Sequence, residues 1–428
     1  MLPKRTQILY GLGVSYAIVD QIFAQWILYF YLPPESSNLK PIMAPALISI
    51  ALAISRIVDM ITDPAIGYLS DKVSTRWGKR IPFIAFGSIP LGISTILFFY
   101  PPVGNNTISF IYLAIIGSLF FTFYTIVGAP YNALIPEIGN SMEERLNLST
   151  WQSVFRLLYT AIAMIIPGIL IKVIGKGDTL YGIRGMVILL SLVAALGGYI
   201  TVFGVSEKKY SKGEISKINF KETISIILSN KNFMFYLFGL LFFFIGFNTL
   251  RATMNYYVED IMGFGKKEIT IASGILFGTS AIFFYPTNRL SKKIGYRKVM
   301  LGCLSLLIVF TTLLFLLNKI IPVSFGFVLF GLIGIPVAGG AFIFPPAMLS
   351  EISNKITEKT GHNIEGICFG IQGFFLKMAF MFSILILPSI LVIGSSNSTV
   401  TKNGIYLTAI FSIVSFIISW IFYYKYKE

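Results

Sequence analysis

Long apolar segments recur along almost the whole 428-residue chain, each bounded by glycine, proline or charged residues. Most of them are long enough to cross a hydrocarbon core of about 30 Å. Only 12% of the residues are charged, whereas a soluble domain carries about 25%. The mean hydropathy is +0.78. The sequence therefore predicts an integral membrane protein, with no separate soluble domain between the spans.

The apolar pattern predicts an all-α membrane protein with twelve transmembrane helices. A charged linker, 206–231, divides them six and six into an N-terminal bundle (1–205) and a C-terminal bundle (232–428). The expected spans are residues 7–32, 41–70, 81–103, 107–136, 149–176, 182–205, 232–262, 267–290, 297–319, 322–351, 365–393 and 400–425.

The basic residues favour one side of this arrangement. If both termini are cytoplasmic, most of the 34 Lys and Arg fall in cytoplasmic segments, as the positive-inside rule requires. The same loops account for the net charge of +15, so we expect no nucleic-acid partner. We expect a multi-pass monomer in a plasma or inner cell membrane, surrounded by the lipid bilayer.

A short motif occurs once in each half. LSDKVSTR at 69–76 recurs as LSKKIGYR at 290–297, in each case after the second span of its half. Duplicated six-helix units of this kind hold substrate near the bilayer midplane between the repeats. The loop charges predict a cytoplasmic gate, for which the candidates are Asp71, Lys72, Arg76, Lys293 and Arg297.

Two carboxylates, Asp59 and Asp63, lie in the second predicted span. Four residues apart on a helix, they share one face, with Cβ atoms about 5 to 6 Å apart. Two anions in an apolar segment are costly unless a cation joins them. Thr62 and Thr125 offer hydroxyl oxygens, which suit Na⁺, whereas a proton needs only one carboxylate. We therefore predict a cation site for Na⁺ or H⁺.

Four segments resemble one branch of a transporter superfamily: RIVDMITDP (56–64), RWGKRIPF (76–83), YTIVGAPYNALIP (124–136) and IEGICFGIQGFFLK (364–377). They are similar to the glycoside-pentoside-hexuronide:cation symporters, the melibiose-permease-like branch of the major facilitator superfamily. The animal sodium-dependent lysophospholipid symporters are also similar. The resemblance covers most of the chain. It implies a major facilitator fold of two six-helix halves and a cation-binding role for Asp59 and Asp63, although Thr62 replaces an asparagine of the melibiose permease.

Lys377 resembles the family's lysine on the eleventh helix. An ammonium that neutralises the acids only when the ion is absent would couple ion occupancy to conformation. The alternative for the acids is a charge network with Arg56 or Lys377 that merely joins helices. For Lys377 itself, the alternative is a side chain that snorkels to the membrane interface.

The substrate residues depart from the melibiose permease, which holds sugar with two acids and an arginine. Asp20 lies about one turn from the place of the first acid, and Gly128 replaces the second, which leaves room for a bulkier group. Gln152 or Ser153 occupies the place of the arginine, and Arg156 lies one turn further on. The remaining substrate candidates are Trp151, Arg251 and Gln372, although Trp151 also suits helix packing and Arg251 a salt bridge with Glu259 or Asp260.

These observations predict a cation-coupled symporter of a sugar, glycoside or glycoside acid that works by alternating access. The alternative substrate is a lysophospholipid or another amphiphile, and a non-transporting receptor is a further alternative. We expect no enzyme activity and no cofactor, because the sequence offers no convincing nucleophile and base or metal cluster.

Overall fold

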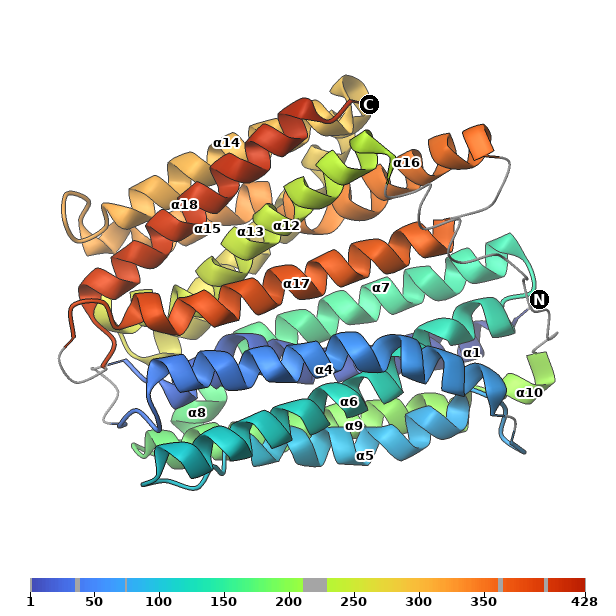
Figure 1. Cartoon of the computed structure of the whole chain (residues 1–428), viewed down its shortest axis with the longest axis horizontal. Helices are drawn as coiled ribbons and strands as arrows, with labels where there is room; N and C mark the ends of the chain where they lie inside the picture. The colour runs from blue at the N-terminus through green and yellow to red at the C-terminus, as the bar shows by residue number, and fades with distance from the viewer. Residues whose placement is uncertain are drawn as a thin grey trace. The chain divides into compact units, whose positions relative to one another are not determined.

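The computed structural model describes residues 2–34, 39–73, 75–210, 229–360, 365–395 and 399–427. The chain divides into two compact units, the first composed of Met1–Pro33 and Ser37–Ile215, and the second of Pro34–Ser36 and Ser216–Glu428. The division after residue 215 falls inside the predicted linker. The described elements of both units are helices (Figure 1).

The first unit contains an interrupted first helix and then a series of long helices. Its elements are α1 (Lys4–Leu12), η1 (Gly13–Tyr16), α2 (Ala17–Ile22), η2 (Phe23–Ile27), α3 (Leu28–Tyr31), α4 (Pro45–Lys72), α5 (Ile81–Leu97), α6 (Asn106–Ile138), α7 (Met142–Ile165), α8 (Pro167–Gly175), α9 (Thr179–Gly204) and the short α10 (Glu207–Tyr210).

The second unit has the same kind of construction. Its elements are α12 (Lys231–Tyr256), η3 (Tyr257–Ile261), α13 (Lys266–Ile294), α14 (Tyr296–Phe315), η4 (Val323–Phe325), α15 (Gly326–Val337), η5 (Ala338–Ile343), α16 (Phe344–Thr360), α17 (Glu365–Leu391) and α18 (Lys402–Lys425). The two copies of the repeated motif begin in the last turns of α4 and α13.

Ten helices of the described ranges are long and apolar enough to cross a membrane. The pair α7 and α8 makes an eleventh if it is one span, bent by 43° at the break before Pro167. The remaining expected span, 81–103, corresponds to α5, which is apolar but has only 17 residues. The helical membrane fold is confirmed, while the count of twelve depends on including the bent pair and α5.

The third span is shorter than expected. The sequence suggested 81–103, but α5 ends at Leu97. Pro101 and Pro102 follow closely, and a proline can neither donate a helical hydrogen bond nor tolerate a helical residue before it. The apolar residues after Leu97 therefore form a turn.

The first span changes its helical winding twice. A 3₁₀ turn, Gly13–Tyr16, precedes α2, and a π-helical turn, Phe23–Ile27, follows it. Such turns shift side chains around a helix axis and often occur at functional sites. Here they flank the segment that carries Asp20.

Candidate cation and substrate site

The predicted acid pair is brought together with a threonine of a neighbouring helix. Thr125 Oγ1 lies 3.1 Å from Asp59 Oδ1 and 2.9 Å from Asp63 Oδ1. Asp59 and Thr125 are buried, and Asp63 is half-buried. One hydroxyl hydrogen cannot satisfy both carboxylates equally, so the group is suited to a further positive charge.

Along their contact, α4 and α6 pair residues that are separated by the same number of positions in the sequence. A Cβ atom on Gly117 would lie 2.1 Å from Ser55 Oγ, so α6 approaches α4 closely at this point. Ser55 and Gly117 are 62 positions apart, and so are Asp63 and Thr125. The two helices therefore run parallel over these two turns, and the close approach at Gly117 brings Thr125 within reach of the acids.

Arg56 is the internal counter-ion of this cluster. Its Nη1 lies 3.2 Å from Asp59 Oδ2, and its Nη2 lies 3.9 Å from Asp20 Oδ1. The guanidinium also lies 4.0 Å from the centroid of the Phe121 ring, and the side chain is buried. The first unit thus gathers three carboxylates, those of Asp20, Asp59 and Asp63, around the Arg56 guanidinium and the Thr125 hydroxyl.

The Thr62 hydroxyl has a partner within its own helix. Its hydroxyl donates to the backbone carbonyl of Asp59 at 3.1 Å. This bond turns the hydroxyl hydrogen along its own helix, as threonines in helices commonly do. The lone pairs of the oxygen atom can still coordinate a cation, so Thr62 stays a candidate ligand.

A second polar group of the first unit surrounds Tyr16. Arg156 Nη2 donates to the Tyr16 hydroxyl at 3.0 Å. The Tyr16 ring packs edge-on against Tyr124, with centroids 5.3 Å apart. A Cβ atom on Gly128 would lie 3.3 Å from this ring, so Tyr16 occupies much of the space that Gly128 was expected to leave.

Three other substrate candidates, Gln152, Trp151 and Gln372, contact neighbouring side chains. Gln152 Nε2 donates to Asn132 Oδ1 at 2.7 Å, and Trp151 stacks on Phe155 with centroids 6.0 Å apart. In the second unit, the buried Gln372 accepts a hydrogen bond of 2.7 Å from the Tyr236 hydroxyl. The Trp151 contact lies within α7, between residues one turn apart.

The charged candidates of the second unit lie on two helices. Arg251 of α12 is half-buried, with its guanidinium carbon 6.0 Å from the Phe247 ring centroid. Lys377 is half-buried in α17. Glu259, one of the expected partners of Arg251, makes an ion pair of 2.6 Å with Lys266.

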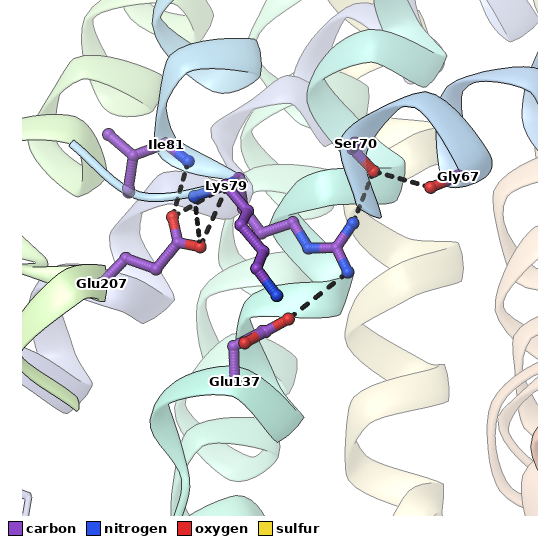
Figure 2. A network of polar contacts seen from close by, with 7 residues as sticks. Gly67, Ser70, Lys79, Ile81, Glu137 and Glu207 are labelled. Atoms are coloured by element: carbon purple, nitrogen blue, oxygen red, sulfur yellow. Dashed lines mark hydrogen bonds and ion pairs between the residues drawn. The ribbon is translucent and has the colours of Figure 1, made fainter. Parts of the chain in front are cut away.

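A network of contacts around Arg80 holds the predicted gate loop of the first unit. Arg80 Nη1 donates to Ser70 at 2.5 Å, and Nη2 lies 3.5 Å from Glu137 Oε1. Figure 2 shows this network between α4 and α6. The side chains of Lys72 and Arg76 are exposed, and Arg76 stacks on Trp77. The side chain of Asp71 lies outside the described part.

A carboxylate from after the sixth span completes this network. Glu207 accepts hydrogen bonds from the backbone amides of Lys79 at 2.7 Å, Arg80 at 2.8 Å and Ile81 at 3.0 Å (Figure 2). These amides lie at the start of α5, where no intrahelical acceptor exists for them. Gly78, with a φ of 118°, lets the loop pass against this carboxylate.

At the matching place in the second unit, an arginine that binds backbone carbonyls takes the place of a carboxylate that binds backbone amides. Arg297 Nε donates to the Tyr423 carbonyl at 3.2 Å, and Nη2 donates to that of Tyr424, near the end of α18. Lys293 is exposed. The start of the third long helix is therefore bonded to a residue just after the sixth in the first unit, and to the last turns of the sixth in the second.

Comparison with known proteins places the chain in a family. A sequence model described as MFS/sugar transport protein matches residues 9–427. The chain belongs to the MFS/sugar transport protein family. The ten long apolar helices of its described residues, together with this family, make it a multi-pass membrane protein.

Relatives found by sequence differ in how much of this chain they match. The putative glycoside/cation symporter YagG of Escherichia coli is 31% identical over 211 residues, which are 48% of this chain and 44% of the relative. Sodium-dependent lysophosphatidylcholine symporter 1 of Xenopus tropicalis is 24% identical over 78% of this chain and 70% of its own length. The first relatives are thus matched over about half of their length.

The fold has a close match among solved structures. The crystal structure of a bacterial homolog of the human lysosomal transporter Spinster, inward-facing and unoccupied, aligns with a TM-score of 0.71. The alignment covers 98% of this chain and 95% of that one, at 13% identity. It shows that the MFS/sugar transport chain has this transporter fold.

Sequence reasoning left Tyr16 and Glu207 out of the candidate site. Tyr16 belongs to an apolar segment like many other tyrosines here, and no spacing marks it. Glu207 directly follows the sixth apolar span, beside RWGKR in space but not in sequence. A carboxylate that binds backbone amides leaves no sequence pattern at the amides, because every residue except proline has one.

Proposed function

We propose that this protein is a secondary active transporter that carries an organic solute together with Na⁺ or H⁺ by alternating access. The single observation that carries the proposal is the Thr125 hydroxyl held between the Asp59 and Asp63 carboxylates within two membrane-spanning helices. Ionisable residues at membrane depth usually mark ion or substrate pathways. Membership of the MFS/sugar transport family supports the same conclusion.

The cation would bind to oxygens of α4 and α6. Asp59, Asp63 and Thr125 supply carboxylate and hydroxyl oxygens, which are hard ligands suited to Na⁺. Thr62 is the candidate for a further oxygen. A proton would instead occupy one carboxylate of the pair. Within the described residues, no three His, Cys, Asp or Glu side chains form a transition-metal cluster.

Coupling requires that the cation changes the energy of one conformation more than another. Arg56 already lies at Asp59, so an arriving cation competes with the guanidinium for that carboxylate. We propose Lys377 as a second coupling residue, on the resemblance of its helix to the family motif. The Arg56 guanidinium would be released from Asp59 when the transported ion binds.

A sugar, glycoside or glycoside acid is the substrate we propose. The family description and the glycoside/cation symporter among its relatives support this class. On the first unit, Asp20, Gln152 and Arg156 provide the hydrogen-bond acceptors and donors that hydroxyl-rich solutes need. A lysophospholipid is the second candidate, because the amphibian lysophosphatidylcholine symporter matches more of the chain than YagG does.

We also propose the orientation that the basic loops favour, with both termini in the cytoplasm. The loops at residues 72–81 and 293–297 would then lie on the cytoplasmic side, where Arg80 and Arg297 would help to form the gate.

Uptake into proteoliposomes tests the function. A panel of labelled sugars, glycosides, glucuronides and lysophospholipids is offered with and without an inward Na⁺ or H⁺ gradient, to the wild type, Asp59→Asn, Asp63→Asn and the control Glu143→Gln. Glu143 is exposed at the start of α7. Gradient-driven uptake that only the two aspartate variants lose supports symport. Uptake that ignores the gradients and both aspartate variants contradicts it.

A further inference from the structure

Arg156 is a cation whose contacts are neutral. It lies in the membrane-spanning part of α7, yet its side chain is exposed. Its Nη2 donates to the Tyr16 hydroxyl, and its guanidinium carbon lies 5.9 Å from the centroid of that ring. Among the described residues, no carboxylate lies within ion-pair distance of Arg156.

The nearest acid along the first span has other contacts. Asp20, one turn after Tyr16, lies 3.9 Å from Arg56 and 3.4 Å from the Gln21 amide. The phenol of Tyr16 is neutral and accepts only one of the five N–H groups of Arg156. Arg156 therefore keeps its positive charge and most of its donors for another group.

Tyr16 fixes where this guanidinium points. Its ring is buried and packs edge-on against Tyr124 and Tyr131, with centroids 5.3 and 5.5 Å away. Gly128 lies between these two tyrosines on the same face of α6, and a Cβ atom there would lie 3.3 Å from the Tyr16 ring. A buried ring packed along this face presents its hydroxyl in one place, so Tyr16 acts as a positioning residue for Arg156.

We propose that the transported solute carries an anionic group, a carboxylate or a phosphate, and that Arg156 binds it while Tyr16 holds the guanidinium in place. A guanidinium presents parallel donors that match both groups, and such charge-assisted bonds are about twice as strong as neutral ones. The proposal rests on the transport function proposed above and narrows its substrate class. A carboxylate would mean a glycoside acid, and a phosphate an anionic amphiphile.

Two pairs of probes that differ in charge test this inference. The first pair is 4-nitrophenyl glucuronide and 4-nitrophenyl glucoside, and the second is oleoyl lysophosphatidate and monooleoylglycerol. Binding to the purified full chain in nanodiscs is measured at saturating Na⁺. We expect the anionic member of one pair to bind at least about tenfold more tightly than its neutral partner.

Variants then test whether Arg156 causes the preference for the anionic probe. Arg156→Gln should bring the affinity ratio of that pair close to one, mainly by weakening the anionic member. Arg184→Gln is the matched control, because Arg184 donates to the Phe99 carbonyl elsewhere in the same unit. Tyr16→Phe should lower the ratio in part, whereas Tyr159→Phe, which removes a hydroxyl bonded to the Leu12 carbonyl, should not. Tyr16→Phe keeps the test available if Arg156→Gln fails to fold.

The inference is overturned if the wild type binds both members of each pair equally, or binds none of the four probes. It is also overturned if Arg156→Gln weakens both members to the same extent. Stabilisation of the protein by Na⁺, in the wild type and in Asp63→Asn, is measured in parallel. Na⁺ stabilisation that depends on Asp63 without any preference for anions would leave symport intact and reject only the anionic substrate.

Discussion

Arg56 Nη1 lies 3.2 Å from Asp59 Oδ2, and both side chains are buried in the first unit. Arg56 precedes Asp59 by three residues, about one turn of α4, and its guanidinium packs over the Phe121 ring. A buried ion pair contributes little net stability, but removal of one partner leaves the charge of the other buried without its counter-ion. In the proposed mechanism, the guanidinium therefore competes with the transported cation for Asp59.

Arg56→Gln should make cation binding tighter. Without the competing guanidinium, the half-saturating Na⁺ concentration should fall by about tenfold, which is about 1.4 kcal/mol. In the absence of Na⁺ the variant should unfold at a lower temperature, since Asp59 loses its counter-ion. Na⁺-dependent thermal unfolding measures both effects, with Arg184→Gln as the control. An unchanged Na⁺ dependence would show that Arg56 does not compete.

Thr125→Val should weaken cation binding. The variant keeps the size of the side chain but removes the oxygen that lies at both Asp59 and Asp63. Loss of one oxygen ligand should raise the half-saturating Na⁺ concentration by about tenfold. Thr122→Val is the control, because that hydroxyl donates to the Ser118 carbonyl on the same helix. Equal effects of the two variants would contradict a special role for Thr125.

Glu207→Gln should loosen the start of α5. The amide side chain keeps the size but loses the negative charge that three backbone amides share, at a cost of about 1 to 3 kcal/mol. Hydrogen exchange at residues 79–81 should therefore become faster. Glu143→Gln, at an exposed carboxylate, should leave that exchange unchanged. Protection that survives in Glu207→Gln would mean that the charge does not hold the loop.

Gly117→Ala should disturb the cation site from two turns away. The added methyl group would lie 2.1 Å from Ser55 Oγ, so α6 must move from α4 and carry Thr125 with it. We expect weaker Na⁺ binding and a loss of about 1 to 3 kcal/mol of stability. The double variant with Ser55→Gly should recover both. Gly274→Ala, where the added methyl group meets nothing within 4 Å, is the control.

The helices and the acid pair could be predicted because each follows from a local pattern. Apolar length predicts a membrane helix, and the spacing of Asp59 and Asp63 predicts a shared face. The sequence offered the Thr125 hydroxyl as a candidate ligand, but its contact with both acids depends on a register of α4 and α6 that Gly117 and Ser55 set. No local pattern encodes that register.

Other features depend on contacts between residues far apart in the sequence. Gln372 looks as available as any polar residue of an apolar helix, yet its oxygen is bonded to Tyr236, 136 positions away. Glu207 reaches the amides of residues 79–81, and Tyr16 reaches Arg156, by the same kind of tertiary packing. The charge of such a residue can be read from the sequence, but its partner cannot.

The reciprocal movement of ion and solute tests the proposed symport most directly. Proteoliposomes with equal ion concentrations on both sides receive an inward gradient of the solute that the uptake panel identifies, and entry of Na⁺ or H⁺ is recorded. If the solute is coupled to a cation at Asp59 and Asp63, the wild type should drive cation entry, and Asp63→Asn should drive none. Solute that enters the wild-type vesicles without any cation would contradict symport.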